Sequence, residues 1–252
     1  MTKTTLATDI LLYTFPSDEP NTLVNNIMAV LDGSKALLVD AAYDDEMKQV
    51  LEDLTANGIT VEAAVVSHFH EDHYDGLSML PDITIYGNDN YIATLAYDSN
   101  EADAAFCTPT HLIINPTTIN FGKHTLEIIP APGHSKCTLL TKINGQFIHI
   151  ADEVLLSLEG KLALPWLCDG ETNEKRQRQL NAWCKLKQIK INTIIPAHGP
   201  AFESDKLAGY IQNLEKYLTA IIQKNGHVTY EDAVKYCDYP LIKENWHENN
   251  CK

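Results

Sequence analysis

The chain has 252 residues, with 19 basic against 34 acidic side chains and a formal net charge of −15. This length suits one large domain that can bury a sizeable apolar core. Because an acidic surface repels polyanions, we expect a small-molecule substrate and no nucleic-acid partner. No segment reaches the roughly twenty apolar residues that a membrane-spanning helix needs, so we expect no membrane partner.

The cysteine pattern bears on the compartment. The six cysteines form no C-x-x-C step and no spacing typical of a disulfide framework. We therefore expect free thiols in a reducing compartment, the cytoplasm, with the periplasm as the alternative if a leader was trimmed. The oligomeric state stays open. The six are Cys107, Cys137, Cys168, Cys184, Cys237 and Cys251.

The first half of the chain alternates extended and helical segments. Asp32-Gly33-Ser34 is typical of a hairpin turn. Apolar residues at helical spacing predict a helix over 44–57, which Gly58 ends. Apolar and β-branched runs predict the strands. The strands are expected near residues 10–15, 23–31, 36–40, 61–66, 83–86, 112–114 and 126–129, with a second helix near 90–97.

The second half continues this alternation and ends in helices. Asn144-Gly145 predicts a hairpin between strands at 137–143 and 146–150, and a further apolar strand is expected at 193–195. After Ser204, apolar residues at helical spacing predict an amphipathic helix. A shorter helix, with Thr229 and Asp232 at its start, is expected after it.

The segment 67–73 reads Ser-His-Phe-His-Glu-Asp-His and predicts a metal site. His68 and His70 alternate along an extended backbone, so their side chains point to the same side. Asp72 and His73 follow where the chain must turn. Three imidazoles and a carboxylate therefore converge at the carboxyl end of the strand at 61–66, which is more metal-binding capacity than a solvated loop or a packed core needs.

Three later strands end in the same way. His134 follows Pro132-Gly133, Asp152 ends the strand after the Asn144-Gly145 turn, and His198 lies between turn residues after the strand at 193–195. Each of these signals alone is weak. Their recurrence after successive strands predicts that the side chains meet at one site.

Taken together, these residues resemble the metallo-β-lactamase superfamily. His68, His70, Asp72 and His73 match its H-x-H-x-D-H motif, and His134, Asp152 and His198 match its later ligands in order. The resemblance implies an α+β fold, a four-layer αβ/βα sandwich, over a single domain of residues 1–252 with a helical C-terminal region from about 203.

The resemblance also implies the division of the ligands between two metals. Metal one is held by His68, His70 and His134, metal two by Asp72, His73 and His198, and Asp152 bridges them. Asp40 resembles the family's first motif, a carboxylate that orients a ligand loop.

The ligand types suit zinc, with two Zn²⁺ per chain expected, while iron and manganese are compatible with the same residues. Two such cations share a water, lower its pKa towards neutrality and supply a hydroxide that attacks an ester-like carbonyl of a thioester, lactone, ester or β-lactam. Asp72 and Asp152 are the expected catalytic residues because they hold the metals.

Several branches of the superfamily remain open as functional assignments. Hydroxyacylglutathione hydrolases (glyoxalase II) share the complete ligand set, although no cluster for the glutathione carboxylates is evident. Class B1 and B2 β-lactamases resemble the chain less, because they have a cysteine ligand where this pattern has Asp152, whereas lactonases and class B3-like β-lactamases remain possible relatives. The alternatives to hydrolysis are a mononuclear iron sulfur dioxygenase, similar to persulfide dioxygenases, and a metal-bound binding module without catalysis.

Two pairs of residues near the predicted site have two interpretations each. Lys136 and Cys137 either begin a strand or reach the pocket, and Trp166 and Leu167 either belong to the core or form an apolar wall of the substrate cleft. The remaining histidines match nothing in the family and are expected at the surface or in packing. They are His111, His124, His149, His227 and His247.

Overall fold

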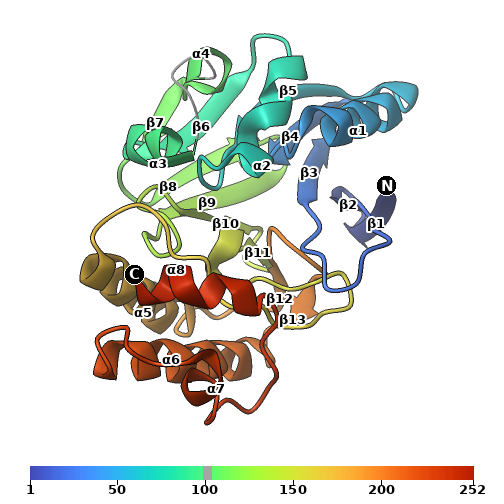
Figure 1. Ribbon diagram of the computed structural model, residues 1–252. Coiled ribbons are helices and arrows are strands. Elements are labelled where there is room, and N and C mark those ends of the chain that lie inside the picture. Colours follow the sequence, from blue (N-terminus) through green and yellow to red (C-terminus); the bar gives the residue numbers. More distant parts are fainter. Residues whose placement is uncertain (99–103) are drawn as a thin grey trace.

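A computed structural model describes residues 1–98 and 104–252 (Figure 1). Its first sheet has seven strands in the order of the chain. The first four pair antiparallel, and the last three continue the sheet in parallel. The strands are β1 (Thr2–Ala7), β2 (Ile10–Thr14), β3 (Asn26–Asp32), β4 (Lys35–Val39), β5 (Thr60–Val65), β6 (Thr84–Asn88) and β7 (His111–Ile113).

The second sheet has six strands in the order β13-β12-β11-β10-β9-β8. All its pairs are antiparallel except β11 with β12, which run parallel. Asn144 and Gly145, both at positive φ, form the turn between β10 and β11, as predicted. The strands are β8 (Thr117–Phe121), β9 (His124–Pro130), β10 (Leu139–Ile143), β11 (Phe147–His149), β12 (Thr193–Ile195) and β13 (Phe202–Glu203).

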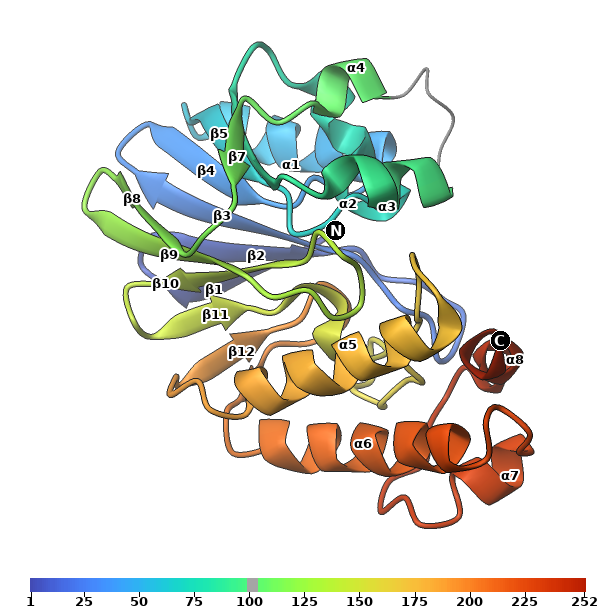
Figure 2. The same ribbon diagram turned by 90° about the vertical axis from the view of Figure 1, so that its left-hand side faces the viewer.

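Helices cover the outer faces of both sheets, which face each other in Figure 2. Over the described residues, no helix is long and apolar enough to cross a lipid bilayer. On the first sheet lie α1 (Asp44–Ala56), α2 (Glu71–Tyr74), η1 (Asp75–Met79), α3 (Tyr91–Asp98) and α4 (Ala104–Cys107). The rest are η3 (Ala151–Glu153), α5 (Thr172–Leu186), α6 (Leu207–Gln223), α7 (Tyr230–Ala233), η4 (Glu244–Trp246) and α8 (His247–Cys251).

Three apolar clusters hold these layers together. The central cluster joins the sheets, with Met28 and Val65 from the first and Ile128 and Ile195 from the second. A second cluster packs α1 and η1 on the first sheet, and a third packs α5 and α6 on the other. Burial of apolar surface on both faces of two sheets produces four layers. The predicted four-layer αβ/βα sandwich is therefore confirmed.

Several elements were absent from the sequence prediction. β1 is exposed along most of its length, and β8 alternates between half-buried and exposed residues, so neither has a buried apolar face that hydrophobic periodicity could detect. The helix α5 was not predicted because its buried face includes the polar residues Lys175, Arg176 and Gln179. A search for apolar residues at helical spacing assigns such residues to the solvent side.

Asn26 connects the two sheets beside the loop that carries His198. Its Nδ2 donates to the carbonyl oxygens of Pro196 at 2.9 Å and Gly199 at 2.7 Å, and its Oδ1 accepts from Thr14 Oγ1 at 2.7 Å. The side chain is only 2% exposed. Water therefore cannot replace these contacts without entering the interior.

We expect Asn26→Ala to lower the free energy of unfolding by about 2 to 4 kcal/mol, because it leaves buried carbonyls without a donor. Chemical denaturation measures this loss. Asn120→Ala, at an exposed position on β8, is the control and should change stability by less than about 0.5 kcal/mol. Equal stabilities of the two variants would contradict the bridging role of Asn26.

Candidate metal centre

The seven predicted ligands meet at one edge of the sandwich, after strands of both sheets. β5 leads into the segment of His68 and His70, and the short helix α2 then carries Asp72 and His73. From the second sheet, His134 follows β9, Asp152 lies in η3 directly after β11, and His198 follows β12. Strand ends thus bring together residues that lie far apart in the sequence.

Three imidazoles form the first group. Nδ1 of His70 lies 3.0 Å from Nε2 of His68 and 3.1 Å from Nε2 of His134. His68 is fully buried, and His134 is 1% and His70 7% exposed. Three nitrogen atoms that converge so closely can all bind one cation.

A second group contains Asp72, His73 and His198. Nε2 of His73 lies 3.3 Å from Asp72 Oδ1, and Nε2 of His198 lies 3.4 Å from Asp72 Oδ2. These ligand atoms also lie close enough together to hold a metal ion. Asp72 is the most exposed of the three, with its side chain 26% exposed.

Asp152 lies between the two groups. Its Oδ2 is 3.9 Å from His68 Nε2 and 3.7 Å from His134 Nε2. Its Oδ1 is 3.6 Å from His73 Nε2 and 3.4 Å from His198 Nε2. One carboxylate therefore presents a different oxygen to each group.

The proton position on His73 tests whether these residues fit a metal. A carboxylate only accepts hydrogen bonds, so Nδ1 of His73, 3.0 Å from Asp40 Oδ2, carries the proton. Nε2 then points a lone pair at the carboxylates of Asp72 and Asp152, and within the described residues it has no hydrogen-bond partner. Such an arrangement needs a cation between the atoms, either a proton or a metal ion, and a divalent metal suits it.

The pKa shifts of the histidines in this cluster point in the same direction. Burial lowers the pKa of His134 to about 3, and it also lowers that of His68 well below its usual range. Burial alone would lower the pKa of His73 as well, but the carboxylates of Asp72, Asp152 and Asp40 outweigh it and raise that pKa to about 10. His68 and His134 are thus neutral, and the second group attracts positive charge.

Asp40 orients the loop that carries four of these ligands. It follows β4 in a left-handed conformation, φ 62°, which aspartate adopts more readily than most residues. Its Oδ1 accepts from Ser67 N at 2.7 Å, and its Oδ2 accepts from Ser67 Oγ at 2.8 Å and from His73. His149 is fully buried beside it, with Nε2 3.7 Å from Asp40 Oδ2. These contacts fix both the path of the loop and the tautomer of His73.

Glu153 and Arg178 hold the loop of His134, and sequence reasoning missed both. The Glu153 carboxylate accepts from the backbone N–H of His134 at 3.0 Å and from Gln179 Nε2 at 2.6 Å. Arg178 donates to the carbonyl oxygens of Gly133 at 3.0 Å and Cys168 at 2.8 Å, and to Asp169 Oδ1 at 2.7 Å. Glu153 lies in η3 and Arg178 in α5, 19 and 45 residues from the atoms of the His134 loop that they contact, so no local sequence pattern predicted these contacts.

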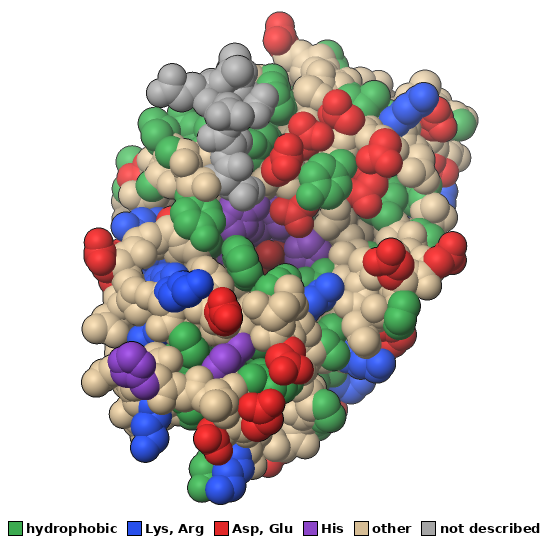
Figure 3. All heavy atoms as spheres, in the orientation of Figure 1, with side chains coloured by type: hydrophobic (Ala, Val, Ile, Leu, Met, Phe, Trp, Pro, Cys, Tyr) green, Lys and Arg blue, Asp and Glu red, His purple; other side chains and the backbone are tan. Residues whose placement is uncertain are grey.

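A cavity of about 430 Å³ opens over the ligands. Its floor includes His70, His134, Asp152 and His198. In Figure 3, histidine side chains are visible in a hollow near the middle of this face, with acidic side chains gathered along part of its rim. A small molecule can therefore reach the candidate metal centre from solvent.

The structure decides between the two interpretations of Lys136, Cys137, Trp166 and Leu167. Trp166 lines the cavity, whereas Leu167 is fully buried in the core. Cys137 is also fully buried, with its Sγ donating to Thr94 Oγ1 at 3.1 Å. Lys136 extends its Nζ to within 3.4 Å of Glu174. Among the described lining residues of the cavity, neither Lys136 nor Cys137 is present.

The remaining histidines lie outside the ligand groups. His124 donates from Nε2 to Leu31 O and accepts at Nδ1 from Asn144 Nδ2. His247 donates from Nε2 to Val228 O, and its Nδ1 lies 3.0 Å from the Tyr217 hydroxyl. His111 and His227 are exposed. Their packing and surface positions agree with the sequence prediction, and His149 packs directly against Asp40.

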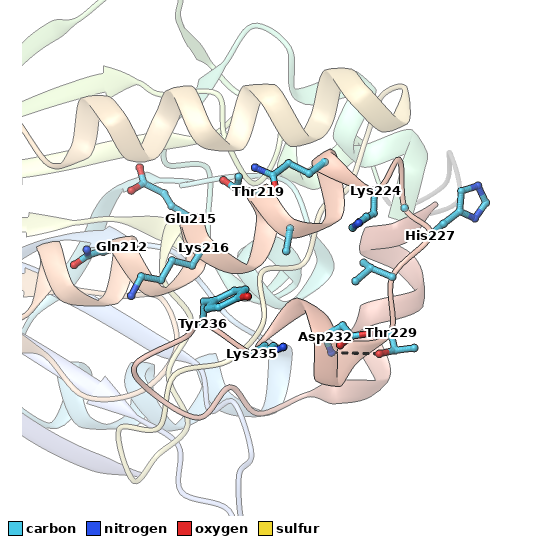
Figure 4. Close-up of a pocket in the computed structure, with 14 residues that line it drawn as sticks. Gln212, Glu215, Lys216, Thr219, Lys224, His227, Thr229, Asp232, Lys235 and Tyr236 are labelled. Carbon is cyan, nitrogen blue, oxygen red and sulfur yellow. Dashed lines mark hydrogen bonds between the residues drawn. The ribbon is translucent and has the colours of Figure 1, made fainter.

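A larger hollow of about 1120 Å³ lies between α6 and α7 (Figure 4). Its lining mixes lysines, such as Lys216 and Lys224, with the acidic Glu215 and Asp232. None of the candidate metal groups found in the described residues lies there. The smaller cavity is therefore the one associated with metal chemistry.

Comparison with known proteins identifies the family. The sequence model of the metallo-beta-lactamase superfamily matches residues 20–198, which is most of the chain. The chain therefore belongs to this superfamily. It is a metallo-hydrolase whose substrate is unassigned.

Individual relatives are distant. The "Beta-lactamase-like protein 2 homolog" of Caenorhabditis elegans is 23% identical over 82% of this chain and 69% of its own length. The hydroxyacylglutathione hydrolase of Haemophilus ducreyi is 21% identical over 74% of this chain and 71% of its own length. A solved metallo-beta-lactamase from Pontibacter korlensis superposes with a TM-score of 0.68 at 20% identity, over 84% of this chain and 99% of its own. That last likeness concerns the fold.

Asp40→Asn should lower zinc affinity by about tenfold to a hundredfold. The amide has only one acceptor oxygen, so it cannot keep the contacts to Ser67 N, Ser67 Oγ and His73 Nδ1 together. Competition with a fluorescent zinc chelator measures the affinity. Asp82→Asn, an exposed position, is the matched control. Wild-type affinity in Asp40→Asn would rule out the orienting role.

Proposed function

We propose that this protein is a binuclear zinc hydrolase that acts on an ester-like carbonyl in a small molecule. One observation carries the proposal: Asp152 turns one oxygen towards the imidazole group and the other towards the Asp72 group. A carboxylate in this position can bridge two cations. On this basis His68, His70 and His134 hold one zinc, and Asp72, His73 and His198 hold the other.

Two zinc ions held in this way supply an activated water as nucleophile and polarise the carbonyl under attack. The chain's residues set the conditions for that chemistry. Asp40 keeps the proton of His73 on Nδ1, so Nε2 stays available as a ligand. The buried imidazoles of His68 and His134 remain neutral because burial lowers their pKa values, so protons compete weakly for their ligand nitrogens.

The substrate class proposed is a thioester, lactone, ester or β-lactam. The cavity of about 430 Å³ is of the size that small-molecule sites commonly have. The relative named hydroxyacylglutathione hydrolase supports a carbonyl substrate within this class. The acidic net charge supports a small-molecule substrate over a nucleic acid.

Elemental analysis of protein purified without chelators tests the metal content. We expect about two zinc ions per chain, because each ligand group offers three side chains and shares Asp152. Removal of the metal by a chelator should abolish turnover, and added zinc should restore it. One iron per chain with little zinc would contradict the proposal and favour oxygen-dependent sulfur chemistry.

Asp152→Ala should reduce turnover by about a hundredfold or more and lower the zinc content, because both groups lose a shared ligand. Hydrolysis of thioester, lactone and β-lactam probes measures turnover, and elemental analysis of the same sample measures zinc. Asp205→Ala, at an exposed position, should leave both unchanged. A metal-replete Asp152→Ala variant with wild-type turnover would exclude the bridging role.

A further inference from the structure

We infer that Lys243 and Trp246, together with Trp166, form a subsite that binds an anionic substrate through its carboxylate and an adjoining apolar group. All three residues line the cavity over the candidate metal centre. This inference rests on the proposed function and names the residues that would bind the substrate beside the metal centre. The family match ends at residue 198, so the contributions of Lys243 and Trp246 belong to a part of this chain outside it.

Backbone pairing fixes Lys243 beside the cavity. The preceding residue, Ile242, forms a parallel bridge with Ala163. Its N–H donates to Leu162 O at 2.9 Å, and its carbonyl accepts from Leu164 N at 2.9 Å. On the other side, the carbonyl of Lys243 accepts from Trp246 N at 2.9 Å. The position of this lysine is therefore set by the fold on both sides.

The backbone conformation of Lys243 is itself unusual. Its φ is 66° and its ψ 43°, in the left-handed region that residues with a long side chain rarely adopt. Glycine or asparagine would adopt this conformation more easily. An unfavourable conformation that the surroundings enforce points to a use for the side chain that occupies it.

The two tryptophans form an apolar wall next to this lysine. Their ring centroids lie 5.2 Å apart with an interplanar angle of 63°, an edge-to-face packing. The tail also holds the neighbours of Trp166: Asn250 Nδ2 donates to Pro165 O at 2.8 Å, and Asn249 Nδ2 donates to Leu167 O at 3.0 Å. The segment 242–250 thus holds both the cation and the aromatic wall in place.

The charges around the cavity favour an anion near Lys243. It is the one Lys or Arg among the described lining residues, and no carboxylate in the described chain forms an ion pair with it. Asp72 and Asp152 face the proposed zinc ions, and Glu71 is the other acidic residue on the wall. A substrate carboxylate can therefore pair with Lys243 while the scissile carbonyl lies over the metals.

Binding of 2-mercapto-3-phenylpropanoate and of its neutral methyl ester tests this subsite. The thiol provides a zinc ligand and the phenyl ring an apolar group for the tryptophans, so the two probes differ only in the carboxylate. Calorimetric titration of the zinc-loaded protein gives both Kd values without any need for turnover. At low ionic strength, we expect the acid to bind about tenfold more tightly than the ester. Added salt should reduce this preference.

The substitution Lys243→Asn removes the charge but suits the left-handed backbone, so we expect a folded protein that binds acid and ester about equally. Lys243→Arg keeps the charge and should retain part of the preference. Lys190→Asn, at an exposed position outside this cavity, should retain all of it. Trp246→Leu should weaken both probes alike and leave their ratio unchanged.

Zinc content, measured on the same samples, separates this inference from the proposed function. With two zinc ions per chain, equal Kd values for acid and ester in the wild type would overturn the Lys243 subsite alone. An undiminished preference in Lys243→Asn would also overturn it. Protein that binds no zinc would overturn the proposed metal centre, and the subsite that rests on it would fall as well.

Discussion

The arrangement depends on one constraint: imidazole and carboxylate groups that converge in the interior need a cation. Asp152 is 8% exposed and is surrounded by the nitrogens of His68, His73, His134 and His198. Lone pairs that face one another without water or a counter-charge repel one another. A divalent ion between them attracts each lone pair and so replaces this repulsion with attraction. A stable interior and metal affinity are thus two aspects of the same geometry.

Three sets of polar side chains, here called clamps, hold three of the four segments that carry the candidate ligands. Asp40 fixes the loop after β5, Glu153 and Arg178 fix the loop of His134, and Asn26 fixes that of His198. Asp40, Glu153 and Asn26 are buried, the Arg178 side chain is 10% exposed, and each bonds to backbone atoms of its loop. Because the clamps come from different elements, the ligand positions depend on the packing of both sheets and not on any loop alone.

Gly133 illustrates how closely one of these loops approaches its clamp. A Cβ at this position would lie 2.3 Å from Glu153 Oε1 and 2.5 Å from the Cβ of Ala182. Only glycine leaves room for the carboxylate to reach the N–H of His134. Pro132-Gly133 was interpreted from the sequence as the end of a strand. The structure shows that Gly133 is also needed for the close packing against Glu153.

The sequence allowed prediction of those features that are encoded locally. His68 to His73 lie within six residues, and His134, Asp152 and His198 each follow an apolar strand, so spacing and turn residues were enough to propose them. Asn26, Glu153 and Arg178 could not be recognised, because the backbone atoms of the ligand loops that they contact lie 19 to 173 residues away in the sequence. The helix α5 was not predicted for a related reason. Its buried Arg176 bonds to Asn250 O, and the residue pattern of the helix alone gives no sign of this distant partner.

Chemistry and recognition come from different parts of the chain. The seven candidate ligands lie within residues 20–198, the range that the superfamily has in common, whereas Lys243 and Trp246 reach the same cavity from the C-terminal segment. Membership of the family therefore bears on the reaction type and leaves the substrate open. Ile242 pairs with Leu162 and Leu164, and Asn249 and Asn250 hold the neighbours of Trp166, so the tail shapes the cavity wall. In the described part of the chain, no hydrogen bond joins residues 242–252 to Asp40, Asn26, Glu153 or Arg178. A change in the tail can thus alter what binds while the metal centre keeps its geometry.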